Sequence, residues 1–358
     1  MSGSVAVDGP RRAGSDDART GSERLRARRR RRVVGIAVLI ALLAVSCVLS
    51  VVIGTKTIPL GDVWHALSAP GGAENDLIIR QLRVPRTLVG VVAGACLGLA
   101  GALMQGHTRN PLADPGILGI THGAAVGVVL SIYTFGITTA LGFVWFGFGG
   151  ALLGALAVFA IGSLGRGGPT PVTLALAGMA ISYLLQAITS ALVLTDQQTL
   201  DAYRFWKIGS IAVTDTAVLW QVVPFLLVGI AVGLANASSL NALALGEDVA
   251  RSLGHRVLWA RRTGIAAIAV LVGGAVAICG PIGFVGLVVP HVARFFTGAD
   301  YRWLLPFAGL LGSSLVLLAD VLGRVVARPS EVQVGVMLAV VGAPFFIALV
   351  RRRKLVRL

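Results

Sequence analysis

The chain has 358 residues, of which 56% are hydrophobic and 13% charged, and its mean hydropathy is +0.84. Soluble domains usually carry about 25% charged residues, and long stretches of this chain have too few polar residues to cover a soluble core. The apolar surface is therefore expected to face lipid. This excludes soluble enzymes and predicts a polytopic membrane protein.

The formal net charge of +15 is concentrated at the two ends of the chain. Residues 1–32 contain ten arginines, and the C-terminus reads RRRKLVRL. Both basic blocks adjoin apolar runs, which indicates anchoring to an anionic inner leaflet and not nucleic-acid binding. We predict a disordered basic cytoplasmic tail over residues 1–32 and a basic cytoplasmic C-terminus over residues 351–358.

Ten apolar runs follow one another between these tails. A helix needs about 20 apolar residues to cross the hydrocarbon layer, and runs of that scale begin near Val33, Thr87, Gly116, Ala140, Val172, Thr216, Thr263, Gly283, Leu304 and Val334. The sequence thus predicts an all-α domain of ten transmembrane helices over residues 33–350. An even number of spans places both termini on the cytoplasmic side.

The distribution of arginines between the spans tests this predicted membrane topology. The loop 236–262 falls in the cytoplasm and is rich in arginine, as the positive-inside rule favours. Arginines that violate the rule lie before the second span and at the end of the ninth: Arg80, Arg83, Arg86, Arg324 and Arg328. Either one helix is misplaced or these side chains reach headgroups, or they form a basic outer surface for an acidic partner.

The second span has glycines at every fourth position, Gly90, Gly94 and Gly98. Small residues on one helix face allow another backbone to approach closely. This span is therefore expected near the centre of a tightly packed bundle.

The chemistry of an energy-coupling site is missing from the sequence. The lysines are Lys56, Lys207 and Lys354, and none follows a glycine-rich phosphate-binding turn. No metal-ligand cluster is indicated, and the spans contain few acids of the kind that ion-coupled transporters need. Asp320 lies four residues before Arg324, which predicts a helical ion pair. A transporter of this composition must take its energy from another subunit.

The loop between the sixth and seventh spans contains LGEDVARSLG. Gly246 interrupts the chain, Glu247 and Asp248 suit the first turn of a helix, and Leu245, Val249 and Leu253 form one apolar stripe. The pattern predicts a short amphipathic helix. It packs on its own bundle or on the lipid surface, or else in the groove of an ATPase.

Several long motifs in the same order resemble the iron–siderophore (FecCD-type) permeases, which are related to the cobalamin importer permease. They are RVPRTLVGVVAGACLGLAGALMQGHTRNPLADPGILGITHGAAVG, LNALALGEDVARSLG, GPIGFVGLVVPHVARFFTGADYRWLLP, LLADVLGR and GAPFF. The resemblance covers nearly the whole chain after about residue 55. It implies a ten-helix type II ABC importer permease that sits in the bacterial plasma (inner) membrane.

The resemblance also implies functional residues. Binding-protein docking falls on Arg83, Arg86 and Arg324. The cytoplasmic gate falls on Asn110, Leu112, Thr170 and Pro171, where Pro171 stands at a place that often holds Ser or Thr in the family. ATPase coupling falls on Gly246, Glu247, Ala250 and Leu253. No catalytic or metal-binding residue is implied.

The implied partners are a second permease chain, identical or related, two ATP-binding-cassette ATPases, an extracytoplasmic binding protein, and membrane lipid, with no nucleic acid. ATP and Mg would be bound by the ATPases, and this chain would hold no cofactor and catalyse no reaction. The expected function is uptake of ferric siderophores by alternating access. Cobalamin or haem import is the alternative within the family. An ion-coupled secondary transporter and a membrane-embedded enzyme are disfavoured, because the spans carry no matching clusters.

Overall fold

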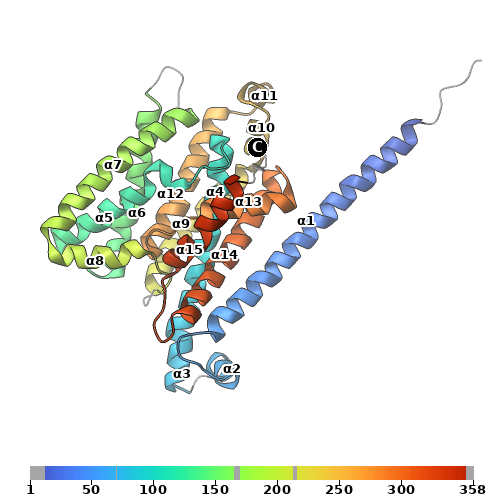
Figure 1. Ribbon diagram of the computed structural model, residues 1–358. Coiled ribbons are helices and arrows are strands. Elements are labelled where there is room, and N and C mark those ends of the chain that lie inside the picture. Colours follow the sequence, from blue (N-terminus) through green and yellow to red (C-terminus); the bar gives the residue numbers. More distant parts are fainter. Residues whose placement is uncertain (1–12, 70, 165–169, 213–215, 352–358) are drawn as a thin grey trace, which may run out of the picture.

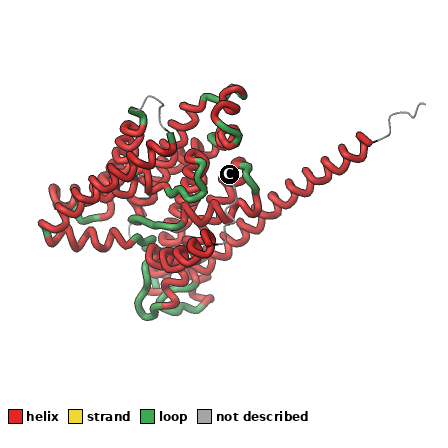
Figure 2. The backbone as a smooth tube through the Cα atoms, turned by 45° about the horizontal axis from the view of Figure 1, so that its top comes forward, coloured by secondary structure: helices red, strands yellow, loops and turns green. Residues whose placement is uncertain are grey.

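The computed structural model describes residues 13–69, 71–164, 170–212 and 216–351, and this part of the chain consists of helices and loops without strands (Figure 2). Each predicted apolar run lies on one of the helices α1 (Ala13–Val52), α4 (Val84–Thr108), α5 (Ile120–Phe135), α6 (Ala140–Gly162), α7 (Pro171–Thr195), α9 (Thr216–Ala235), α12 (Val257–Cys279), α13 (Val285–Thr297), α14 (Tyr301–Val326) and α15 (Val334–Arg351). The all-α membrane fold predicted from the sequence is confirmed.

Shorter elements connect these helices. They are α2 (Leu60–Ser68), α3 (Glu74–Leu77), η1 (Ile78–Arg83), η2 (Pro115–Leu118), α8 (Gln197–Ile208), α10 (Ala237–Ala244) and α11 (Glu247–Ser252). Figure 1 shows α2 and α3 at one end of the bundle and α10 and α11 at the opposite end. The predicted docking residues, near α3, and the predicted coupling residues, around α11, therefore lie at opposite ends of one structure.

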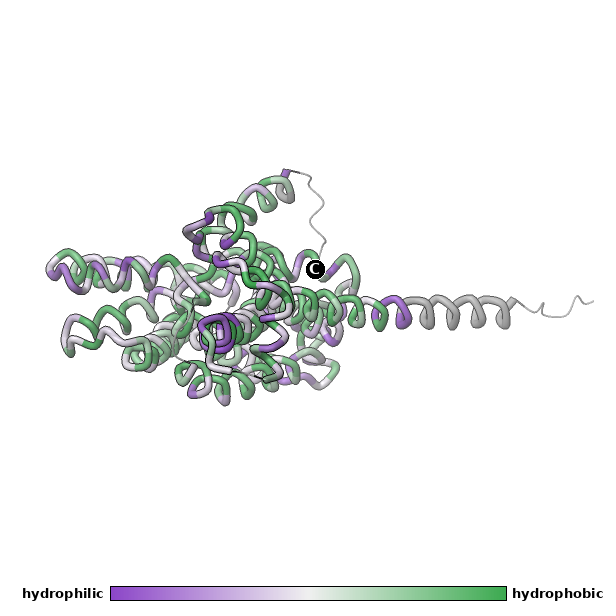
Figure 3. Tube along the Cα trace, turned by 90° about the horizontal axis from the view of Figure 1, so that it is seen from below, coloured by the Kyte–Doolittle hydropathy of each residue, from purple (hydrophilic) through white to green (hydrophobic). Residues whose placement is uncertain are grey.

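The lengths of the apolar helices differ. Within the described residues, seven are long and apolar enough to cross a membrane, and the apolar helices Ile120–Phe135, Val285–Thr297 and Val334–Ala348 are shorter. At 1.5 Å per residue α13 is about 20 Å long, less than the hydrocarbon layer of roughly 30 Å. Ten apolar helices are present, while ten complete crossings remain a prediction. Along the backbone, apolar residues predominate in the long helices (Figure 3).

Helix α4 lies near the centre of the bundle, as its glycines predict. A Cβ atom on Gly94 would lie 2.5 Å from the carbonyl oxygen of Gly312, and one on Gly98 would lie 2.2 Å from that of Ala308. A Cβ atom on Gly101 would lie 2.1 Å from the carbonyl oxygen of Gly286. Backbone contact with α14 and α13 is therefore possible only because α4 lacks side chains at these positions.

The N-terminal segment differs from the predicted tail. Residues 13–32, expected to be disordered, continue α1 as helix, and residues 1–12 lie outside the described residues. Arg, Ala and Glu are strong helix formers, so the helix extends from the apolar segment at little cost. Arg32 also holds the middle of α1 to the bundle, because it donates to the carbonyl oxygen of Thr297 at 2.8 Å and forms an ion pair with Asp300 at 3.1 Å. The predicted C-terminal tail, residues 351–358, lies beyond the described residues except for Arg351.

Candidate functional site

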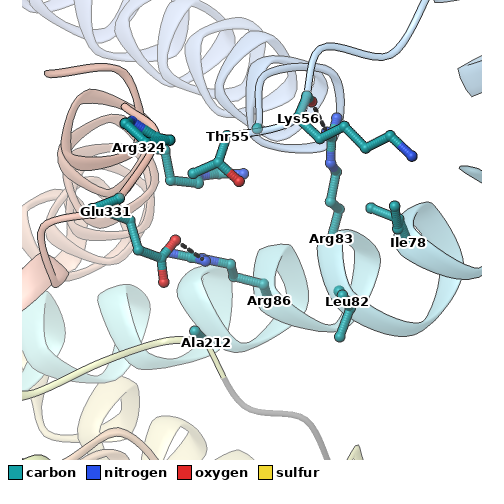
Figure 4. Close-up of a pocket in the computed structure, with 12 residues that line it drawn as sticks. Thr55, Lys56, Ile78, Leu82, Arg83, Arg86, Ala212, Arg324 and Glu331 are labelled. Atoms are coloured by element: carbon teal, nitrogen blue, oxygen red, sulfur yellow. Dashed lines mark hydrogen bonds and ion pairs between the residues drawn. The ribbon is translucent and has the colours of Figure 1, made fainter. Parts of the chain in front are cut away.

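The three arginines assigned to docking, Arg83, Arg86 and Arg324, meet in a pocket of about 460 Å³ at the end of the bundle that carries α2 and α3 (Figure 4). Arg83 and Arg86 come from η1 and α4, Arg324 from the last turns of α14, and Glu331 from the loop before α15. The lining also includes Lys56, which pairs with Glu74 at 2.7 Å, so four cationic side chains share the three carboxylates of Glu74, Asp320 and Glu331. This surplus of positive charge suits an acidic ligand.

Arg86 is the centre of a buried ion network. Its Nε and Nη2 atoms donate to both oxygens of Asp320, at 2.7–3.1 Å, and its Nη1 atom donates to Oε2 of Glu331 at 2.8 Å. Asp320 is fully buried and also pairs with Arg324 at 2.9 Å, as the spacing of four residues predicts. One carboxylate thus neutralises parts of two buried guanidinium groups, which is how charges are tolerated at this depth.

Arg83 and Arg324 are held mainly by backbone carbonyl groups. Arg83 donates to the carbonyl oxygens of Val51, Val52 and Lys56 at 2.6–2.9 Å. Arg324 donates from Nη1 to those of Ser50 and Ile53. These carbonyl groups belong to the end of α1 and the loop that follows it, where a helix leaves its last carbonyl groups without intrahelical partners.

The three arginines that are expected to meet an acidic partner are buried in the structure. Arg83, Arg86 and Arg324 are 5%, 8% and 2% exposed, and their guanidinium groups bond within the chain. Arg80 and Arg328 are the exposed arginines of this end, and Arg328 donates to the carbonyl oxygen of Gly54 at 2.9 Å. Burial follows because Asp320 and the end of α1 supply the hydrogen bonds that water would otherwise supply.

The predicted amphipathic helix is present as α11 at the opposite end of the bundle (Figure 1). Gly246 precedes it with φ of +113°, a conformation that L side chains rarely adopt. Leu245, Val249 and Leu253 are exposed by 66%, 43% and 60%. These three residues form the apolar stripe of the loop. The bundle does not cover this stripe, so of the predicted alternatives the lipid surface and the groove of an ATPase both remain.

The other residues of this loop fix its position. Ala250 is fully buried against the chain. Glu247 forms an ion pair with Arg261 of α12 at 2.7 Å and a longer one with Arg251 at 3.5 Å. Glu247 and Ala250 therefore attach α11 to the bundle, while Leu253 is directed outward.

The predicted gate residues lie on two loops at this same end. Asn110 is exposed, and its side-chain oxygen accepts a hydrogen bond from the Leu112 N–H at 2.9 Å. Thr170 caps α7, where it exchanges hydrogen bonds with Thr173, and Pro171 occupies the first helical position. Helix α7, which follows the second loop, packs closely on η2, which follows the first, because a Cβ atom on Gly178 would overlap the carbonyl oxygen of Ile117.

Two polar features were not recognised as sites in the sequence. One is a pocket of about 370 Å³ between η2, α5 and α7, lined by Asp114, His122, Tyr183 and Gln186. The other is buried Arg294, which donates to the side-chain oxygen of Gln105 at 2.6 Å and so joins α13 to α4. Asp114 lies within the TRNPLADP motif, but Tyr183 and Gln186, which line the pocket with it, come from helix α7 far along the chain. The spacing of residues in the sequence could therefore not predict this pocket.

An apolar helical bundle with a cationic pocket at one end and an exposed apolar helix at the other has the features of the membrane subunit of a transporter. The comparison with protein families is specific: the FecCD transport family matches residues 42–352. The chain therefore belongs to the FecCD transport family, whose members are permease components of ABC transporters.

Individual relatives agree with this assignment. The chain is 44% identical to the ferric enterobactin transport system permease protein FepD of Escherichia coli (strain K12), over 90% of this chain and 96% of that one. It is 40% identical to the iron(3+)-hydroxamate import system permease protein FhuB of Bacillus subtilis (strain 168), over 89% of this chain and 84% of the relative. The cobalamin import system permease protein BtuC of Halobacterium salinarum is 38% identical, over 90% and 89%.

A solved structure has the same fold. It is described as an inward-facing conformation of a metal-chelate type ABC transporter, with a TM-score of 0.78 and 30% sequence identity. The match covers 89% of this chain and 99% of the solved one. The arrangement of helices in Figure 1 is therefore that of a metal-chelate type permease.

Proposed function

We propose that this chain is the permease subunit of an ABC importer for ferric siderophores, inserted in the inner membrane with both termini in the cytoplasm. The observation that carries the proposal is the opposition of two sites on one bundle. The cationic pocket around Arg86 lies at one end, and the exposed stripe of Leu245, Val249 and Leu253 lies at the other. A binding protein and an ATPase would thus act on opposite faces of the membrane.

At the outer end, acidic groups of the binding protein would enter the cationic pocket. The exposed arginines Arg80 and Arg328 would meet them first. Because Arg86 already pairs with Glu331, an incoming carboxylate would have to share or replace that contact. Docking would then displace or rearrange Glu331 in the loop before α15, in addition to contacting the arginines.

At the cytoplasmic end, the apolar stripe would insert into a groove of an ATPase that binds and hydrolyses ATP with Mg. Closure of two such ATPases would move α11, and the Glu247–Arg261 ion pair would transmit the movement to α12. The loops of Asn110, Leu112, Thr170 and Pro171 would then part as the cytoplasmic gate. A second permease chain, identical or related, would complete the pathway.

Ferric siderophore is favoured as cargo by the names of the relatives at 40–44% identity, which concern ferric enterobactin and iron(3+)-hydroxamate. The polar pocket of Asp114, His122, Tyr183 and Gln186 offers uncharged hydrogen-bonding groups and one carboxylate. Such a lining would let a bulky chelate pass without holding it tightly. Cobalamin is the second candidate, because a cobalamin permease is 38% identical.

The test is uptake of iron-55 as several ferric siderophores, with labelled cobalamin alongside, in cells with and without this gene. Each assay is repeated with the cognate ATPase disabled. Loss of uptake of one siderophore in both backgrounds is the expected result and identifies the cargo. Loss of cobalamin uptake alone would transfer the proposal to that substrate. Uptake that needs this chain but not the ATPase would refute ATP-driven import.

A further inference from the structure

An apolar groove of about 280 Å³ runs between α6 and α12, away from every site described above. Its floor is formed by small residues, Ala155 on α6 and Ala269 on α12. Larger side chains, Leu152, Phe159 and Ile265, stand around it. The groove exists because alanines occupy positions between bulky neighbours on both helices, so the two surfaces do not meet there.

The groove has a defined depth in the membrane. Along α12 it extends from Arg262 to Val270, a rise of about 12 Å, which is close to half of the hydrocarbon layer of roughly 30 Å. Trp259, one turn before Arg262, is 57% exposed. Tryptophan is enriched at the membrane–water interface, so Arg262 lies at headgroup level and the groove lies in the adjoining leaflet.

Arg262 closes the polar end of the groove, and it differs from the arginine beside it. Arg261 is buried and forms an ion pair with Glu247. Arg262 is exposed, and within the part of the chain that the structure describes no hydrogen bond or ion pair engages it. A guanidinium group next to an apolar channel matches a phosphate joined to an acyl chain, because its planar donors fit phosphate oxygens.

We propose that this groove is a binding site for an anionic phospholipid, with one acyl chain between α6 and α12 and the phosphate on Arg262. The occupant is a membrane lipid and not a free anion, because the apolar lining of the groove can bind an acyl chain but offers no interaction to a free phosphate ion. The proposal does not depend on the transported substrate. It depends on the proposed orientation only in that the leaflet would be the cytoplasmic one.

Native mass spectrometry of the purified full-length permease, titrated with phosphatidylglycerol or phosphatidylcholine, tests the site. We expect one phosphatidylglycerol to be retained per chain in preference to phosphatidylcholine. Arg262→Ala should lower that affinity about fivefold, while Arg262→Lys should retain most of it. The matched control is Arg256→Ala, which removes the same charge from an exposed residue just before α12 and outside the groove.

The apolar part of the site is tested separately with Ala266→Phe, which fills the groove from an exposed position. This variant should lose both lipids. Equal losses in Arg262→Ala and Arg256→Ala would mean a general basic surface and would overturn the proposal. Unchanged binding in Ala266→Phe would overturn it too, as would a change in oligomeric size, since the groove would then be a protein contact.

Discussion

Arg86 and Asp320 are 234 positions apart in the chain and form a buried pair in which both carboxylate oxygens accept hydrogen bonds from one guanidinium group. The pair joins the start of α4 to the end of α14. The same two helices meet through glycine contacts farther along, at Gly94 and Gly312. The cationic pocket is therefore built on a helix pair whose backbones approach each other closely, which explains how it can hold charges in a fixed arrangement.

Asp320 is expected to contribute more to stability than any other acid of the pocket. Asp320→Asn leaves both Arg86 and Arg324 without their shared buried carboxylate, and loss of one partner from such a network costs about 3–5 kcal/mol. Glu331→Gln should cost below about 1 kcal/mol, because its side chain is 28% exposed. Thermal unfolding in detergent measures both, with exposed Glu74→Gln as the control. Similar losses in all three variants would contradict the assigned hierarchy.

Glu331 is expected to compete with the binding protein for Arg86. Its ion pair with Nη1 of Arg86 occupies the donor that an incoming carboxylate would use. Glu331→Gln should therefore tighten binding of the cognate binding protein to the permease in nanodiscs by roughly three- to tenfold. Asp62→Asn removes a carboxylate of α2 at the same end that accepts a hydrogen bond from Asn75, outside the pocket lining, and should change the affinity little. Weaker binding of the Glu331 variant would mean that this side chain assists docking.

The sequence identified these arginines but not their surroundings. Violation of the positive-inside rule marks five arginines, and the resemblance to the FecCD-type permeases singles out Arg83, Arg86 and Arg324 among them. The Asp320–Arg324 pair is predicted because four residues bring two side chains together on a helix. The pairing of Arg86 with Asp320 and Glu331 depends on helix packing across more than 200 positions, which local spacing does not encode. The burial of these arginines could therefore not be predicted from the sequence.

The apolar runs predict where the long helices lie but not where each helix begins. The apolar run near Thr263 begins six residues after α12 does, because Arg261 and Arg262 lie inside the helix. One of these arginines is neutralised by Glu247 and the other is exposed. Charges thus mark the edge of the apolar layer and not the end of the helix.

Leu253 is expected to contact the ATPase without supporting the fold. It is 60% exposed, so Leu253→Asp should leave thermal stability within about 0.5 kcal/mol of the parent. The new charge should disrupt an apolar contact and reduce co-purification of the ATPase at least about tenfold. Leu77→Asp, at an exposed leucine on the opposite end of the bundle, is the matched control. Equal recovery of ATPase with both variants would remove the stripe from the interface.

Alanine substitution of a closely packed glycine in α4 is expected to lower the stability, whereas the same substitution at a helical glycine with open space around it should raise it. Gly98→Ala would place a Cβ atom 2.2 Å from the carbonyl oxygen of Ala308, so α4 and α14 must separate, at a loss of about 1–3 kcal/mol. Gly149 in α6 has nothing within 4 Å of the added carbon, and alanine there should gain about 0.5–1 kcal/mol of helix propensity. Thermal unfolding of the two variants in the same detergent measures the expected loss of stability in one and the expected gain in the other. A tolerated Gly98→Ala would mean that the helices do not meet through backbone atoms.

Asp114 in the proposed gate loop is expected to act through its cap and not through its charge. Its Oδ1 atom accepts the Gly116 N–H at 2.8 Å and so caps η2, while burial raises the pKa of the carboxyl group and the same hydrogen bond partly opposes that rise. Because the folded-state pKa is raised, ionisation above it disfavours the folded state, and asparagine avoids that penalty.

Asp114→Asn retains a capping oxygen and should match or exceed the parent in stability at pH 8, with the difference shrinking as the pH falls and Asp114 becomes protonated. Asp114→Ala loses the cap and should be about 1 kcal/mol less stable than Asp114→Asn at every pH, because neither residue titrates. Unfolding midpoints across pH 5–8 compare the three proteins, with substrate uptake measured in parallel. If asparagine were as damaging as alanine to both stability and uptake, the carboxylate charge itself would be required, and the gate loop would need an electrostatic role.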